Sequence, residues 1–222
     1  MPDSVPNERN TPRSRALRSV DHTMERRRVT YENEVKRLVD AGFALVQRTG
    51  KLEPTVGEIV SEAGLSNQAF YKHFHSKDEL LLAMLEEGIL LLRSYIEHQV
   101  EAGSTCGERI QNWIEAILEQ ALSPQGAEAT RPFVISRARL SDRFPSEVEE
   151  AEERLTAILS EEIRKGVERG ELPGSEPERD ARLLYNLAMG WVERQLISPS
   201  SDPRADADHL VSFARNGLTR SS

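Results

Sequence analysis

The sequence predicts an all-α protein with a small N-terminal helical unit and a larger helical domain. Apolar residues recur at helical spacing along most of the chain, and no stretch alternates with a period of two for long enough to form a convincing strand. Aromatic residues make up only 5% of the 222 residues, so Leu, Ile, Val and Ala must supply the core, which suits packed helices better than a β-sandwich. Proline and glycine separate the helical stretches, which is typical of helix ends.

The N-terminal segment changes character near residue 24. Residues 1–23 contain three prolines and no apolar periodicity, which predicts a disordered basic arm. From about residue 24 to residue 48 the apolar residues fall at i, i+3, i+4 and i+7 and predict the first helix. The run Arg26, Arg27 and Arg28 lies at its start. Such a run is either a solvated face or a segment that lies along phosphates or enters a minor groove.

Two short helices should follow, joined by a tight A-G-L turn. Thr55 caps the first, and Glu58 three residues later completes a capping box. Ser66 caps the second, over residues 67–74, and Ser76 caps a longer helix that runs to about residue 100. Their inner faces carry apolar residues that we expect in the core: Val56, Ile59, Leu65, Phe70 and Phe74. Two short helices around a glycine turn predict a helix-turn-helix.

The second short helix carries several hydrogen-bonding side chains and a single charged one. Asn and Gln can pair with adenine edges in a major groove, while Lys, Ser and Tyr can hold phosphates. A face rich in amides is also found on helices that are merely solvated, and short helix pairs with a glycine turn occur in many helical proteins. The pattern alone therefore leaves both DNA binding and a structural role open.

Residues 37–82 resemble the N-terminal domain of the TetR (tetracycline-repressor-like) family of bacterial transcriptional regulators. Five motifs carry the resemblance, in order and without gaps: R-L-V-D-A-G-F-A-L-V-Q-R-T-G, T-V-G-E-I-V, A-G-L-S, Y-K-H-F and S-K-D-E-L. The resemblance implies a helix-turn-helix DNA-binding domain over residues 24–76. It implies a helical effector-binding and dimerisation domain over residues 77–222.

The resemblance also implies roles for single residues. Those that would contact bases are Asn67, Gln68 and Ala69. Those that would contact the DNA backbone are Thr55, Ser66, Tyr71, Lys72, His73 and Lys77. Gln68 departs from the family pattern, which usually has a small residue there, so it either adds a base contact or changes how deeply the helix docks.

The function that the resemblance implies is a ligand-responsive regulator, by family default a repressor. It would bind palindromic operator DNA as a homodimer. The alternative within DNA binding is a constitutive or partner-controlled regulator that has no small-molecule effector. An apolar cavity of ligand size in the larger domain would favour an effector, and a solid core would favour the alternative.

The larger domain should hold further helices over about residues 106–122, 131–141, 146–169, 177–197 and 204–218. Polar and aromatic residues within its apolar helices are candidates for an effector pocket: Tyr95, His98, Trp113, Phe133, Arg137, Tyr185, Asn186 and Trp191. The last two helices carry broad apolar stripes that suggest a two-fold dimer interface. The candidates there are Leu183, Leu187, Gly190, Trp191, Leu210, Phe213 and Ala214.

The residues give little support to an enzyme. The chain has no pair of Glu-x-x-His motifs for a di-iron bundle and no phosphate-binding glycine loop. Its one cysteine, Cys106, excludes an intramolecular disulfide and a cysteine-based zinc cluster. We therefore expect no catalytic residue, metal or cofactor, only an effector of unknown identity. The absence of a signal-like segment and of an apolar run near 20 residues predicts a cytoplasmic protein.

The charge distribution separates the two parts of the chain. The net charge is −8, which taken alone disfavours a polyanionic partner. Residues 1–80, however, hold 13 basic and 12 acidic side chains, whereas residues 81–222 hold 16 and 25. Residues 9–28 hold seven arginines against two acidic residues. The acidity therefore belongs to the larger domain, and the expected DNA-binding end is neutral to basic.

Overall fold

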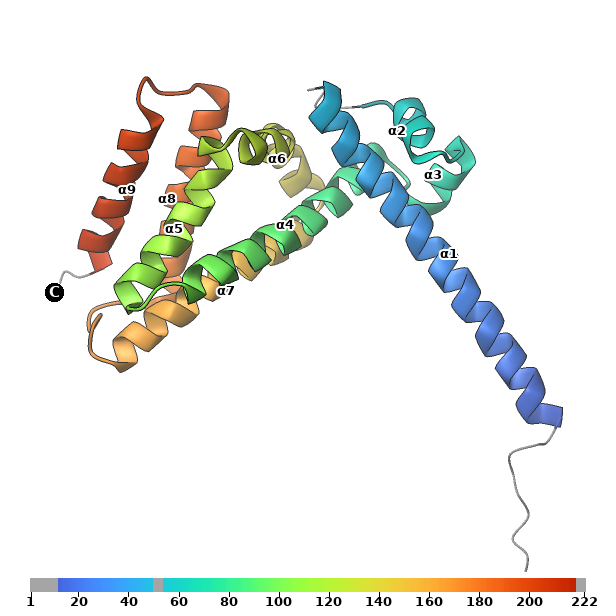
Figure 1. Ribbon diagram of the computed structural model, residues 1–222, viewed down its shortest axis with the longest axis horizontal. Coiled ribbons are helices and arrows are strands. Elements are labelled where there is room, and N and C mark those ends of the chain that lie inside the picture. The colour runs from blue at the N-terminus through green and yellow to red at the C-terminus, as the bar shows by residue number, and fades with distance from the viewer. Residues whose placement is uncertain (1–11, 50–53, 219–222) are drawn as a thin grey trace, which may run out of the picture.

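The structure, a computed structural model, describes residues 12–49 and 54–218, and these residues form nine helices and no strand (Figure 1). The all-α prediction is confirmed. The helices are α1 (Pro12–Thr49), α2 (Val56–Ala63), α3 (Asn67–His73), α4 (Lys77–Glu101), α5 (Cys106–Leu122), α6 (Pro124–Arg143), α7 (Pro145–Glu168), α8 (Pro177–Ile197) and α9 (Pro203–Leu218). Within the described ranges, no helix has both the length and the apolar character needed to cross a membrane.

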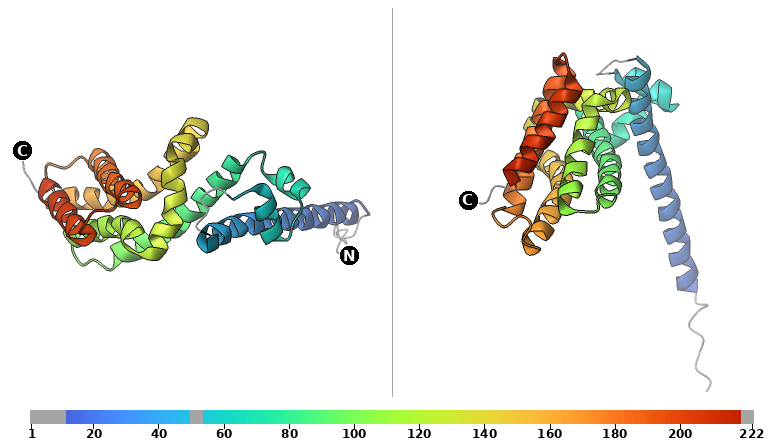
Figure 2. Two further views of the ribbon diagram at one scale, coloured as in Figure 1. Left: turned by 90° about the horizontal axis from the view of Figure 1, so that it is seen from above. Right: turned by 60° about the vertical axis from the view of Figure 1, so that its left-hand side comes forward.

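Two main apolar cores hold the helices together. The first joins α1, α2, α3 and the start of α4 around Leu38, Ile59 and Phe70. The second joins the rest of α4 to α5, α7, α8 and α9. Helix α4 belongs to both, because Met84 packs in the first core while Ile96 packs in the second. The views in Figures 1 and 2 show this long helix running from the small unit into the larger one.

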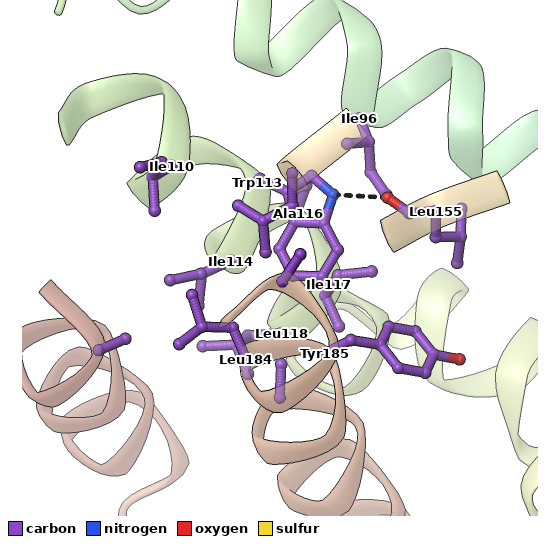
Figure 3. Packing of buried hydrophobic residues seen from close by; sticks show 14 of the residues in the cluster. Ile96, Ile110, Trp113, Ile114, Ala116, Ile117, Leu118, Leu155, Leu184 and Tyr185 are labelled. Carbon is purple, nitrogen blue, oxygen red and sulfur yellow. Dashed lines mark hydrogen bonds between the residues drawn. The ribbon is translucent and has the colours of Figure 1, made fainter. Parts of the chain in front are cut away.

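Helix α5 lies at the centre of the larger unit and packs against α4, α6, α7, α8 and α9. Its apolar face is nearly continuous, and Ile110, Trp113, Ile114 and Ile117 are fully buried or almost so. The indole Nε1–H of Trp113 donates a hydrogen bond of 3.1 Å to the carbonyl oxygen of Leu155 on α7 (Figure 3). This bond satisfies the one polar atom of a large buried side chain, as buried indoles require.

Helix α1 begins at Pro12, well before the start expected near residue 24, and its N-terminal half projects away from the rest of the protein (Figure 1). The prediction of a disordered arm is therefore wrong for residues 12–23, while residues 1–11 lie outside the described part. No glycine or proline occurs between residues 13 and 41, and proline is compatible with a first helical position. Ion pairs at i, i+3 and i+4, such as Arg28–Glu25 at 2.9 Å, add to the helical preference.

Helix α6 also begins earlier than expected, at Pro124 instead of about residue 131. Residues 124–126 fall in the break expected between the helices over 106–122 and 131–141, but they form the first turn of α6. Ser123 caps this turn, because its Oγ accepts a hydrogen bond of 3.1 Å from the backbone N–H of Gly126. Proline at the first helical position loses no intrahelical bond, so a proline next to a serine marks a start here.

Candidate nucleic-acid interface and ligand cavity

The geometry of α2 and α3 is set by local signals and by contacts from α1. The Thr55–Glu58 capping box and the Ser66 cap are both present, as predicted. Gly64 between the helices adopts a φ of 62°, the left-handed conformation that favours glycine. Arg37 of α1 donates to the carbonyl oxygen of Ala63 at 2.6 Å and to that of Gly64 at 3.0 Å. The turn is therefore fixed both by the left-handed conformation of Gly64 and by the hydrogen bonds from Arg37.

Helix α3 has a buried inner face and a polar outer face. Phe70 is fully buried and its ring lies 5.8 Å from that of Phe74, within the first core. On the opposite side the side chains of Asn67, Gln68 and Tyr71 are exposed. The amides of Asn67 and Gln68, which the family resemblance implies would contact bases, are thus open to a partner. Ala69, the third base-contact candidate, is half-buried.

His73 differs from its predicted role as a backbone contact. Its side chain is 0% exposed, and its Nε2 lies 2.6 Å from Oε2 of Glu34 on α1. The ring of Tyr31 packs on it edge-to-face, with 4.3 Å between ring centroids. A buried imidazole cannot reach a phosphate, so His73 anchors α3 to α1. The sequence prediction failed because the residues that cover His73 lie about 40 positions earlier in the chain.

Glu34 and Tyr31 were not among the predicted site residues, although a signal for them exists. They lie three positions apart on α1, on the face that carries the buried Leu38 at i+7. Glu34 also accepts a hydrogen bond of 2.9 Å from Nζ of Lys72. This bond, with the bond to His73, lowers the pKa of the Glu34 carboxyl. Lys72 nevertheless remains 54% exposed and can be approached by a phosphate.

The other predicted backbone contacts lie at helix starts or on exposed faces. Thr55, Ser66 and Lys77 are all exposed, the first two as caps and Lys77 in the first turn of α4. Arg26, Arg27 and Arg28 are exposed along the projecting half of α1, where Arg28 pairs with Glu25 and Glu32. All of these positions belong to the N-terminal part of the chain, from α1 to the first turn of α4, and their side chains are exposed.

The larger unit contains an apolar cavity of about 140 Å³ between α4, α6, α7 and α8. Of the eight effector candidates, Phe133, Arg137 and Tyr185 line it. An adjoining cleft of about 400 Å³ is lined by Tyr95 and shares Phe43 and Phe133 with the cavity. The rings of Phe43 and Phe133 meet edge-to-face at 6.5 Å between centroids, and both line the two spaces.

The remaining four effector candidates line neither space. Trp113 belongs to the core of the larger unit, and Trp191 is half-buried against the same core. His98 and Asn186 are exposed on the outer faces of α4 and α8. Polar and aromatic residues within an apolar helix did not by themselves distinguish a cavity wall from a core or a surface.

The outer faces of α8 and α9 carry apolar residues open to solvent. Leu183 is 59% exposed and Phe213 is 64% exposed. Leu187 and Gly190 follow Leu183 at i+4 and i+7, so the three form one stripe on α8. Leu210 and Ala214, also predicted for a dimer interface, are instead buried within the protomer. Their part of the apolar stripe is used to hold α9 on the core.

Comparison with known proteins gives one family match and several relatives. Residues 38–84 match the family model described as bacterial regulatory proteins, tetR family. The chain is 25% identical over 146 residues to the HTH-type transcriptional regulator SrpR of Pseudomonas putida. This match covers 64% of this chain and 65% of SrpR, so the chain spans just under two thirds of that protein. It is 28% identical over 167 residues to the regulator BetI of Rhizobium meliloti, covering 73% of this chain and 77% of BetI.

Solved structures share the fold. A TetR-family regulator from Pectobacterium atrosepticum superposes with a TM-score of 0.71 at 19% identity, covering 87% of this chain and 98% of that one. The regulator FadR of Bacillus subtilis, solved in complex with stearoyl-CoA, gives a TM-score of 0.66 at 17% identity, covering 82% and 98%. At these identities the likeness extends to the fold.

Proposed function

We propose that this chain, a member of the TetR family of bacterial regulatory proteins, binds operator DNA as a homodimer and is controlled by a small molecule. The observation that carries the proposal is the outer face of α3. It presents Asn67, Gln68 and Lys72 on a helix whose own position is fixed by a serine cap, a phenylalanine core and the contact with Glu34. A rigid helix with exposed amides and a lysine is what readout of a major groove requires.

Homodimer formation is supported by the exposed apolar stripe on α8 and by Phe213 on α9. Large apolar side chains that are open to solvent on adjacent helices are typical of an interface. A two-fold axis through this surface would pair α8 and α9 with their copies and present two α3 helices to a palindromic site. Such a protein would act in the cytoplasm, where bacterial DNA lies, and repression is the family default.

Effector control is supported by the cavity in the larger unit. Its wall includes Phe43 of α1, so the space touches the helix that also holds α3. A constitutive regulator would need neither an apolar cavity nor an adjoining cleft. In FadR of Bacillus subtilis, a protein of the same fold, stearoyl-CoA is bound. The open space therefore favours a ligand-controlled regulator over the alternative without an effector.

Selection from a random duplex pool tests the DNA-binding proposal. The purified full chain should enrich a palindromic motif, and Asn67→Ala combined with Gln68→Ala should weaken that enrichment while leaving the melting temperature unchanged. A double substitution of two exposed residues outside α3 and outside the proposed dimer surface, Glu149→Ala with Glu153→Ala on α7, serves as the matched control. Failure of the unmodified chain to enrich any motif would refute DNA readout by α3.

A further inference from the structure

The cavity in the larger unit contains a surplus of negative charge. Arg137 donates from Nη2 to Oε1 of Glu152 at 3.0 Å and from Nη1 to Oε1 of Glu193. Among the cavity-lining residues that the structure describes, Arg137 is the one Lys or Arg side chain and the two glutamates are the acids. One guanidinium therefore faces two carboxylates, and the cluster carries a net charge of −1 before a ligand enters.

Apart from the amide of Gln120 and the hydroxyl of Thr130, the rest of the wall is apolar and aromatic. Leu, Ile, Val and Ala side chains cover most of it, and Phe43, Phe133 and Tyr185 contribute three rings. The Tyr185 hydroxyl points away from Trp113 and the rest of the labelled core (Figure 3). Burial raises the pKa of Tyr185, and the nearby Glu152 raises it further, so the phenol stays neutral. Aromatic faces attract cations through their quadrupoles, most strongly where water is excluded.

We infer that this cavity binds a small organic cation with an apolar body, whose charge is balanced by Glu152 and Glu193. The inference rests on the proposed function, since it names the class of effector for the same cavity. A cation brings the cluster to neutrality. An anion would have to compete with two carboxylates for Arg137 and would raise the local charge to −2. A neutral ligand would desolvate the surplus carboxylate without compensating it.

The volumes limit the size of the cation. A cavity of about 140 Å³ is close to the engineered cavity of about 150 Å³ that accepts benzene. The body of the ligand can therefore be one aryl ring or a short branched alkyl chain. A longer ligand would extend into the adjoining cleft of about 400 Å³, whose wall shares Phe133 with the cavity.

Calorimetric titration with three probes of similar size tests the inference. The probes are benzyltrimethylammonium, benzyl alcohol and 3-phenylpropionate, titrated into the full-length protein. We expect the cation to bind at least about tenfold more tightly than either other probe, the range that one charge-assisted contact supplies. Equal affinities, tighter binding of the neutral or anionic probe, or no binding of the cation would each overturn the inference.

Variants locate the binding to the cluster. The variants Glu193→Gln and Glu152→Gln should each bind benzyltrimethylammonium about tenfold more weakly. The double variant should bind 3-phenylpropionate more tightly than the cation. Glu153→Gln is the matched control, because Glu153 is exposed on α7 beside Glu152 and does not line the cavity. Arg137→Gln removes the positive charge that balances one of the glutamates, so this variant should bind the cation more tightly. An unchanged cation affinity in both single glutamate variants and in Arg137→Gln would refute the assignment.

DNA binding is measured in parallel, so that the two proposals can fail separately. If the chain binds the cation but enriches no DNA motif, the regulator proposal falls and the ligand assignment stands. If it enriches a motif but shows no preference for the cation, the ligand class is wrong and the regulator proposal stands.

Discussion

Lys72 offers the sharpest test of how α3 engages DNA. Its side chain is 54% exposed, and its ammonium lies 2.9 Å from Oε2 of Glu34. The substitution Lys72→Ala removes this cation, while Glu34 keeps its hydrogen bond to His73 and so still anchors α3 to α1. We therefore expect the fold to persist and the affinity for all DNA sequences to fall.

The salt dependence gives the magnitude. Each phosphate that a protein neutralises on B-DNA contributes a slope of about −0.9 to the dependence of log K on log salt. A homodimer carries Lys72 twice, so the slope should become shallower by about 1.8. Between 50 and 200 mM salt, the affinity ratio of the unmodified protein to the variant should then shrink by about twelvefold.

Fluorescence anisotropy with a labelled duplex, taken from the selected pool and repeated at several salt concentrations, measures both slopes. Lys36→Ala is the matched control, because Lys36 is also an exposed lysine in an ion pair, with Asp40 at 3.0 Å. It lies two residues from Glu34 on α1, which places it on the opposite side of that helix. An unchanged slope in Lys72→Ala, or an equal change in Lys36→Ala, would refute the assignment of Lys72 to a phosphate.

Three further substitutions test other parts of the molecule. Gln68→Ala should relax the preference at one base pair, with a loss of about 1–3 kcal/mol in binding free energy for the preferred base. If the motif selected from the duplex pool is unchanged, Gln68 does not contact a base. Trp113→Phe should lower the free energy of unfolding by about 2–3 kcal/mol, because the variant loses the hydrogen bond to Leu155 and leaves a cavity. Urea unfolding measures this free energy, and a decrease below about 0.5 kcal/mol would contradict the prediction. Leu187→Glu should give a monomer with a nearly unchanged melting temperature, and a persistent dimer in sedimentation would exclude this face.

The parts of the site that the sequence predicts correctly are those fixed by neighbours in the chain. Thr55 and Glu58 form their capping box within four residues, and Ser66 caps α3 within the same distance. Both signals need no knowledge of tertiary contacts, because the donor and the acceptor belong to one helical turn. For the same reason the helix-turn-helix could be placed to within a residue or two.

The parts that the sequence misses depend on contacts between distant helices. His73 is a polar residue of the type expected on an exposed face. It is buried because Glu34 and Tyr31 of α1 pack against it. The sequence makes Arg137 a candidate for the cavity, but its two carboxylate partners, Glu152 and Glu193, come from α7 and α8. The spacing of residues near Arg137 in the chain therefore could not predict these ion pairs. Residues 12–23 carry no apolar periodicity, so a prediction based on periodicity missed the first three turns of α1.

The same helix, α1, carries Phe43 in the cavity wall and Glu34 at the anchor of α3, nine residues apart and therefore about 13 Å along one rigid axis. If the cavity binds an effector and α3 binds the operator, as proposed, a substitution at Phe43 that accommodates a new effector also changes how α1 holds α3. The wall positions on α6 and α8, such as Val134 and Met189, carry no such constraint. Engineering a biosensor from this protein should therefore diversify those positions first and leave α1 intact.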